Sequence, residues 1–357
     1  MAKTMDKTLS CCQTVGADAY VTALLEASSP ESFPLACTLD ITERCNLTCV
    51  HCYLGTRRQG GCAHLEAELA DRIMTALAAG GTLVLAITGG EPLLHPEFRE
   101  IWMAAKRRGF LVSLFTNATV IDQALADFLA AHPPRRVEVS LYGATRETYE
   151  LVTKVPGSHA KCLNGLRLLK DAGVRVQIKC PVLRANKAEL EAIEAWAVAM
   201  GFTYRSDSLI SPTLDGESDP LDHRIPVGDA NGVCPKDSKE CIADVSQDLA
   251  CTDGDDRLVT CGAGLRTIHV DVTGQIHPCL LWRFESRPVL ETSPRQWNAH
   301  MDSLRLKRLP MASECRTCAA RSLCPACPAL SQLEGGATGI ELPYYCDLMR
   351  EAGLKAD

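Results

Sequence analysis

Residues 45–53 read CNLTCVHCY and place three cysteines, Cys45, Cys49 and Cys52, within one short run. The run directly follows an apolar stretch, 35–41, that reads as a buried strand. Iron–sulfur clusters are normally held by four cysteine thiolates, so a loop with three leaves one iron without a protein ligand. An open coordination position distinguishes a catalytic metal site from a structural one. The loop therefore indicates a cluster that binds and activates a small molecule.

Zinc is the alternative for this loop, because the three cysteines and His51 together form a Cys3His donor set. His51 lies between Cys49 and Cys52, however, and this spacing is too tight for two separated ligand pairs. The loop favours the iron cluster, and on its own leaves zinc open.

Composition limits the class of protein and its partners. The chain has 357 residues, 46% of them hydrophobic, which allows a substantial core and about two domains. A net charge of -7 argues against nucleic acid or an anionic membrane as the main partner. The sequence contains neither a transmembrane-length apolar run nor the apolar core of a signal peptide at its start. We therefore expect a cytoplasmic protein.

The 19 cysteines indicate metal or redox chemistry, because disulfides are rare in the cytoplasm. Ten of them form two groups, three in the first loop and seven between Cys261 and Cys346. We interpret most of the other nine as ordinary buried thiols.

Short apolar runs alternate with segments of helical period from residue 35 to residue 210. The runs predict six strands, at 35–41, 82–88, 110–116, 136–141, 174–181 and 202–210. The segments between them predict helices at 64–79, 96–108, 121–131, 160–171 and 187–200. Such alternation is typical of an α/β fold with a parallel sheet, either an incomplete barrel or an open sheet. In both, working side chains lie at the carboxyl ends of the strands, which is where the three-cysteine loop falls.

The pattern changes near residue 211. Residues 211–260 are rich in Asp, Gly, Ser and Pro, and we interpret them as a bridge. Residues 261–357 are dense in cysteine and short of regular periodicity, which predicts a region organised by metals rather than by a large core. The expected organisation is an N-terminal extension at 1–34, a strand–helix domain at 35–210, the bridge, and a cysteine-rich domain.

A second motif ends the second predicted strand, where 83–93 reads LVLAITGGEPL. Two adjacent glycines permit unusual backbone angles and close approach of a ligand, and the glutamate that follows them can pair with an ammonium group. This motif and the three-cysteine loop together resemble the radical S-adenosylmethionine (SAM) superfamily over about residues 35–210. The resemblance implies a partial (β/α)6 barrel, similar to a TIM barrel.

The same resemblance implies a set of cofactor ligands. Cys45, Cys49 and Cys52 would hold a [4Fe–4S] cluster whose fourth iron binds SAM. The positions that it assigns to SAM are His51 near the adenine, Gly89, Gly90, Glu91 and Pro92 at the methionyl amine, and Asn117 and Ser140 at two further strand ends. The chain departs from relatives at Tyr142, where many have Asp, and at Thr153, near which several have an Arg for the SAM carboxylate.

The C-terminal cysteines form a third motif. Over about 261–350 their spacing resembles the SPASM extension of radical SAM enzymes, which carries two auxiliary [4Fe–4S] clusters, although only two residues separate Cys324 from Cys327. The resemblance assigns one cluster to Cys315, Cys318, Cys324 and Cys346, and the other to Cys261, Cys279 and Cys327. Cys251 is the expected fourth ligand of the latter, and an iron left open for substrate is the alternative.

These motifs predict an oxidoreductase or maturase that cleaves SAM reductively to a 5′-deoxyadenosyl radical, which then removes a hydrogen from the substrate. The resemblance implies a ribosomally made peptide as substrate, modified by a thioether, a C–C crosslink or epimerisation. A tetrapyrrole or other small molecule is the alternative, and a non-catalytic iron–sulfur electron carrier is a third interpretation. Leu280 follows Cys279, where sulfatase-maturing relatives have an Asp, and this argues against that reaction.

The expected partners are a substrate and a low-potential electron donor of the flavodoxin or ferredoxin type. Only some 34 residues precede the first predicted strand, so we expect recognition of a leader peptide to need a separate protein. Candidate substrate contacts are Lys179, Arg205, Asp207 and Asp215. The alternatives are a solvated turn for the last three and an outward-facing strand position for Lys179.

Overall fold

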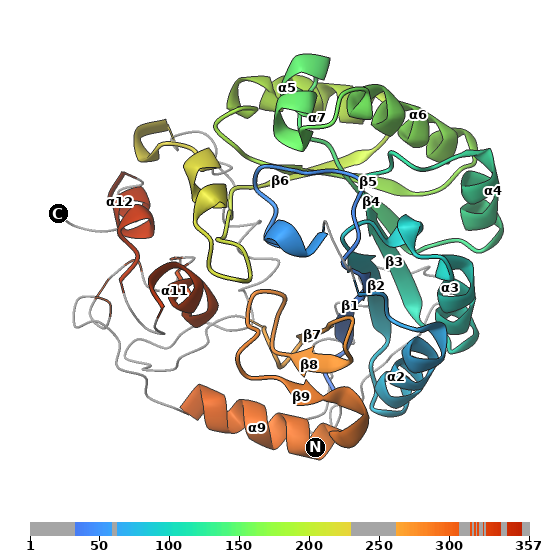
Figure 1. Cartoon of the computed structure of the whole chain (residues 1–357). Helices are drawn as coiled ribbons and strands as arrows, with labels where there is room; N and C mark the ends of the chain where they lie inside the picture. Colours follow the sequence, from blue (N-terminus) through green and yellow to red (C-terminus); the bar gives the residue numbers. More distant parts are fainter. Residues whose placement is uncertain are drawn as a thin grey trace, which may run out of the picture.

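The computed structural model describes residues 33–58, 63–229 and 262–306, and further on residues 315, 318, 320, 324, 326–336 and 341–351. Its centre is a curved parallel sheet that forms a partial barrel (Figure 1). The parallel strands predicted from the sequence are β1 (Ala36–Thr42), β2 (Val84–Gly89), β3 (Leu111–Thr116), β4 (Arg136–Ser140), β5 (Val176–Pro181) and β6 (Thr203–Asp207). Each pairs with the next, so the predicted fold class is confirmed.

Helices cover the outer face of this sheet (Figure 1). The predicted ones are α2 (Ala67–Ala79), α3 (Phe98–Arg107), α4 (Gln123–Ala131), α6 (Ser158–Asp171) and α7 (Leu190–Ala199). In α3, Phe98, Ile101, Trp102 and Ala105 recur at helical spacing and are all buried against the sheet. The apolar residues whose periodic spacing predicted these helices thus form the face that each helix buries.

Several short elements were not predicted. Helix α5 (Arg146–Thr153) has only eight residues and begins at the N-cap Thr145, whose hydroxyl accepts from the backbone N–H of Thr148. Short 3₁₀ helices outside the predicted elements are η1 (Gly55–Arg58), η2 (Pro92–Leu94), η4 (Asp219–His223), η5 (Val227–Asp229) and η6 (Val289–Glu291). The helix predicted at 187–200 begins with one further 3₁₀ turn, η3 (Lys187–Glu189). Elements of this length bury too few side chains to produce a readable period.

The cysteine-rich region extends the same sheet. Strand β7 (Thr267–Val270) pairs parallel with β1, and β8 (Gln275–His277) and β9 (Arg287–Pro288) follow antiparallel. Helix α9 (Pro294–Leu306) places Trp297, Met301 and Leu304 in the core that also holds β1 and α2. The prediction that metals rather than a large core organise this region is therefore wrong for 267–304, because strands of two to four residues carry no visible alternation.

Two further helices lie at the open side of the barrel, α11 (Pro328–Gly335) and α12 (Pro343–Glu351) (Figure 1). Arg224, in the described part of the bridge, is 6% exposed and forms a salt bridge with Glu334 of α11. Its guanidinium also donates to the Ile210 carbonyl at 2.6 Å and to the Tyr345 hydroxyl at 3.1 Å. This buried cation joins the bridge to both helices. The rest of the predicted bridge, 230–260, lies outside the described residues.

None of the helices in the described ranges combines the length and the apolar character needed to cross a membrane.

Candidate active site

The three-cysteine loop starts where β1 ends and is held there by the end of β2. The backbone N–H of Gly90 donates to the Thr42 carbonyl at 2.8 Å, and that of Glu91 donates to the Arg44 carbonyl at 2.7 Å. A Cβ on Gly89 would lie 2.1 Å from the Thr42 carbonyl oxygen, and one on Gly90 would lie 2.4 Å from that of Arg44. The two glycines are thus required because the backbone of the thiol loop passes directly against them.

The other side of the loop rests on helix α5. The backbone N–H groups of Thr48 and Val50 donate to the carbonyls of Thr153 and Val152 at 3.1 and 3.0 Å. Thr153 is fully buried, and its hydroxyl lies 2.8 Å from that of Ser158. The residue near the arginine position of relatives therefore serves as a support for the loop and is not among the residues that line the cavity described below.

All three thiols of the loop open onto one cavity of about 350 Å³ at the carboxyl ends of the barrel strands. Of the residues predicted from the sequence, the cavity is lined by Cys45, Cys49, Cys52, His51, Gly89, Gly90, Asn117, Ser140, Lys179 and Asp207. Leu280 and Leu281, from the cysteine-rich region, form part of its wall. Four candidates are not among its lining residues: Glu91, Pro92, Arg205 and Asp215.

Glu91 is fully buried beneath the cavity floor, where both carboxylate oxygens are hydrogen-bonded within the protein. One oxygen accepts from the Thr116 hydroxyl at 2.7 Å and from the Leu93 N–H at 3.2 Å, and the other accepts from the Asn117 N–H at 2.7 Å. Burial raises the pKa of Glu91 to about 7, in spite of these three donors. Its carboxylate thus joins the end of β2 to the end of β3, and the following Pro92 begins η2.

Asn117 contacts the thiol loop directly. Its side-chain nitrogen lies 3.8 Å from the Cys45 sulfur and donates to the Asn46 side-chain oxygen at 3.0 Å. The backbone N–H of Leu47 also points at the Cys45 sulfur, at 3.4 Å. A thiolate at Cys45 would therefore receive two donors from the protein, which lowers the energy of its charged form.

Charged side chains of β4, β5 and β6 form the opposite wall. Glu138 is buried, lines the cavity, and forms ion pairs with Arg136 at 2.6 Å and Arg205 at 2.9 Å. Lys179 and Asp207 lie 3.8 Å apart and both line the cavity. Sequence reasoning missed Glu138, although a carboxylate at the centre of the strand RVEVS is the signal that could have found it.

Tyr142 is a second residue whose place in the site was not predicted. It lines the cavity, and its ring lies 5.1 Å from that of His51. Burial raises the pKa of Tyr142, and the nearby Cys49 raises it further, so the phenol is neutral. The position where many relatives have Asp thus supplies an uncharged aromatic wall beside His51.

The C-terminal thiols are described only in part. Cys279 and Cys327 pack against the same small apolar cluster, formed by Ala263, Trp282 and Ala329. Cys346 is buried on α12, and its sulfur lies 3.0 Å from a carboxylate oxygen of Glu341. Cys315, Cys318 and Cys324 are partly buried, whereas Cys251 and Cys261 lie outside the described residues. Cys279 and Cys327 thus lie beside one apolar cluster, and their assignment to one iron–sulfur cluster stays a prediction.

The donor set fits an iron–sulfur cluster with one open iron. Three thiols of one loop line a cavity that the rings of His51 and Tyr142, two glycines and polar strand residues also line. Such a cavity has the size of a small-molecule site and lies where barrel enzymes bind their ligands. The fold and the site together define the class of iron–sulfur barrel proteins that bind a small molecule at the cluster.

Part of the chain matches a known protein family. Residues 39–197 match the radical SAM superfamily. The chain is 26% identical over 272 residues to the antilisterial bacteriocin subtilosin biosynthesis protein AlbA of Bacillus subtilis, covering 73% of this chain and 58% of that protein. It is 29% identical over 178 residues to the AdoMet-dependent heme synthase of Methanosarcina barkeri, covering 50% of this chain and 51% of that protein.

The fold is shared with a solved structure. The crystal structure of SuiB of Streptococcus suis bound to S-adenosylmethionine superimposes with a TM-score of 0.66 and 16% identity, over 87% of this chain and 76% of that one. The chain spans 51 to 58% of the length of the two curated relatives. Residues 39–197 therefore match a radical SAM domain, as the sequence motifs predicted, and the chain is similar to radical SAM proteins.

Proposed function

We propose that this protein is a radical SAM maturase that removes a hydrogen atom from a ribosomally made peptide. The observation that carries the proposal is that Cys45, Cys49 and Cys52 open onto the cavity whose floor contains Gly89 and Gly90. When bound to the three thiolates, a [4Fe–4S] cluster with SAM supplies reductive cleavage of the S–C5′ bond and a 5′-deoxyadenosyl radical.

The chain's own residues then bind and orient SAM, and they exclude water from the cavity. Gly89, Gly90 and Ser140 offer backbone and hydroxyl groups to the polar end of SAM, and His51 with Tyr142 offers an aromatic surface for its adenine. Leu280 and Leu281 cover the cavity with apolar side chains, which keeps water from a reactive intermediate.

The charged strand ends are the best placed groups for contact with the substrate. Lys179 and Asp207 line the cavity at the side away from β1, and their 3.8 Å separation leaves both able to bind a polar peptide group. Arg205 does not line the cavity but forms an ion pair with Glu138, which does. Asp215 is exposed in a turn and is not among the residues that line the cavity.

A peptide substrate is favoured over a tetrapyrrole because the two relatives match different shares of this chain. The bacteriocin biosynthesis protein matches over 73% of the chain, whereas the heme synthase matches over 50%. We extend the proposal to two auxiliary [4Fe–4S] clusters on the C-terminal cysteines, a low-potential flavodoxin or ferredoxin as electron donor, a separate leader-binding protein, and a cytoplasmic location.

Anaerobic reconstitution tests the proposal. The loaded protein should contain about 12 iron atoms per chain, three clusters of four, and should release 5′-deoxyadenosine from SAM with dithionite. Cys49→Ala should lose about four irons and all SAM cleavage, whereas Cys162→Ala, at a buried thiol in α6, should keep both. A fully loaded protein that binds SAM without cleaving it would contradict the enzymatic proposal and favour an electron carrier.

A further inference from the structure

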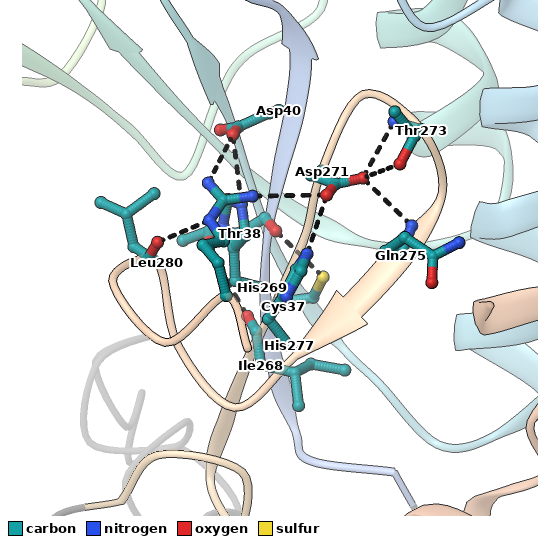
Figure 2. Close-up of polar contacts among 11 residues, drawn as sticks. Cys37, Thr38, Asp40, Ile268, His269, Asp271, Thr273, Gln275, His277 and Leu280 are labelled. Atoms are coloured by element: carbon teal, nitrogen blue, oxygen red, sulfur yellow. Dashed lines mark hydrogen bonds and ion pairs between the residues drawn. The ribbon is translucent and has the colours of Figure 1, made fainter. Parts of the chain in front are cut away.

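A buried network of charges joins β1 to the β7–β8 hairpin (Figure 2). Asp40 of β1 is 3% exposed and lies five residues before Cys45. One of its oxygens lies 3.1 Å from His269 Nε2 and 3.2 Å from Arg283 Nη2. The strand that leads into the thiol loop is thus tied to the cysteine-rich region by a carboxylate.

Arg283 connects this carboxylate to the cavity wall. Its Nε donates to the Leu280 carbonyl at 2.8 Å, and its Nη1 lies 3.5 Å from an Asp271 carboxylate oxygen. Asp271 in turn lies 2.8 Å from His277 Nε2 and accepts from the backbone N–H groups of Thr273 and Gln275 (Figure 2). Each nitrogen of the guanidinium therefore has its own partner, and the three partners lie on different parts of the chain.

The network is charged although it is buried. Burial raises the pKa of Asp40, but His269 and Arg283 more than offset this, and the pKa lies below its usual value. Removal of a partner from a buried carboxylate costs far more than loss of a surface ion pair. His269 and Arg283 are therefore the two partners that stabilise the buried Asp40 carboxylate.

We propose that Arg283 is a positioning residue, which fixes the Leu280–Leu281 wall against the thiol loop by holding the Leu280 carbonyl and Asp40 with one guanidinium. The inference rests on the proposed function, because the wall that it fixes is the cover of the proposed SAM cavity. Leu280 and Leu281 line the cavity together with Tyr53, the residue next to Cys52. A shift of the Leu280 carbonyl would therefore change how closely the cavity is covered.

A lysine cannot replace this arginine. The planar fork of a guanidinium reaches a carbonyl and two carboxylates in fixed directions, whereas an ammonium is a single point of charge. Arg283→Lys keeps the charge beside Asp40 and loses the simultaneous hold on Leu280. This variant separates positioning from charge balance.

The test uses the reconstituted full chain with Arg283→Lys, and Leu280→Ala as a second variant that opens the same wall without changing the network. Arg108→Lys is the control, at an ion pair with Asp71 that joins α2 and α3 away from the cavity lining. The readouts are iron content, the thermal midpoint, the dissociation constant for SAM, and the rate at which the cluster absorbance bleaches in air.

Both Arg283→Lys and Leu280→Ala should keep the iron content, bleach several times faster than the parent, and bind SAM about tenfold more weakly. Arg108→Lys should match the parent in all four. Parent-like bleaching and SAM affinity in Arg283→Lys, with Leu280→Ala affected or not, would overturn the inference. Bleaching needs only the cluster, so it reports on Arg283 even if the loaded protein fails to cleave SAM.

Discussion

The side-chain amide of Asn117 lies 3.8 Å from the sulfur of Cys45 and joins the end of β3 to the first thiol of the loop. The amide is fixed in this direction because its oxygen accepts from the backbone N–H and the hydroxyl of Thr119, at 2.9 and 2.6 Å. A residue that the family resemblance assigned to SAM thus also touches a cluster ligand.

Asn117→Ala should make the reduction potential of the SAM-binding cluster more negative. Hydrogen bonds to cluster sulfurs favour the reduced, more negative cluster. Loss of one worth about 1 kcal/mol corresponds to roughly 40 mV for a one-electron couple. Potentiometric titration followed by electron paramagnetic resonance measures the shift. Asn164→Ala, on the exposed face of α6, is the control, and an equal potential in both variants would contradict the prediction.

Gly90→Ala should weaken the attachment of the thiol loop. The added methyl would lie 2.4 and 2.5 Å from the carbonyl oxygens of Arg44 and Glu43, so β2 and the loop must separate. We expect a loss of about 1–3 kcal/mol in the free energy of unfolding, as for other overpacked sites, and a lower iron content. Gly228→Ala, where nothing lies within 4 Å of the new Cβ, is the matched control in denaturant unfolding.

Glu91→Gln should destabilise the protein although it preserves shape. Whichever way the amide is turned, its NH2 group faces either the Leu93 N–H or the Asn117 N–H, so one buried donor loses its acceptor. The expected cost is about 1–3 kcal/mol in the free energy of unfolding. Glu68→Gln, at an exposed position of α2, should cost nothing measurable. A parent-like stability of Glu91→Gln would mean that the carboxylate is not the joint between β2 and β3.

Stability should fall as the pH drops below the ordinary histidine pKa, and His95 should contribute. Its Nε2 donates to the Leu65 carbonyl at 3.0 Å and its Nδ1 accepts from the Glu97 N–H at 3.0 Å, which fixes the neutral ring. Burial lowers the pKa of His95 below its usual 6.5, so the unfolded chain takes up the proton first. The contribution is complete above pH 6.5 and is lost progressively below it, and titration of the ring by nuclear magnetic resonance checks the direction.

If the stability of His95→Phe depended on pH as that of the parent does, other groups would be responsible for the loss of stability below pH 6.5. The matched comparison is His277, whose pKa burial also lowers, in spite of the Asp271 carboxylate 2.8 Å away. The two rings have different hydrogen-bond partners, Leu65 and Glu97 for His95 and Asp271 for His277, so their contributions should add.

The sequence by itself determined the barrel and the grouping of the three thiols. Apolar runs such as the one in β2 are long enough to show their strand character, and the helices between them bury one face of regular period. Cys45, Cys49 and Cys52 are neighbours along the chain, so their spacing alone predicts that they share one site. The sequence also predicted a close approach at Gly89 and Gly90, although by a ligand and not by the chain's own backbone.

Only the tertiary structure decided what these residues touch. The glycines are needed because the backbone of the thiol loop passes 2.1 to 2.5 Å from where a Cβ would be, and the Glu91 carboxylate is used between strands rather than in the cavity. The joining of β7 to β1, and with it the contact between Arg283 and Asp40, spans more than two hundred residues of sequence. Contacts at such separation depend on how strands pair and on which charges are buried together, and neither leaves a local pattern in the sequence.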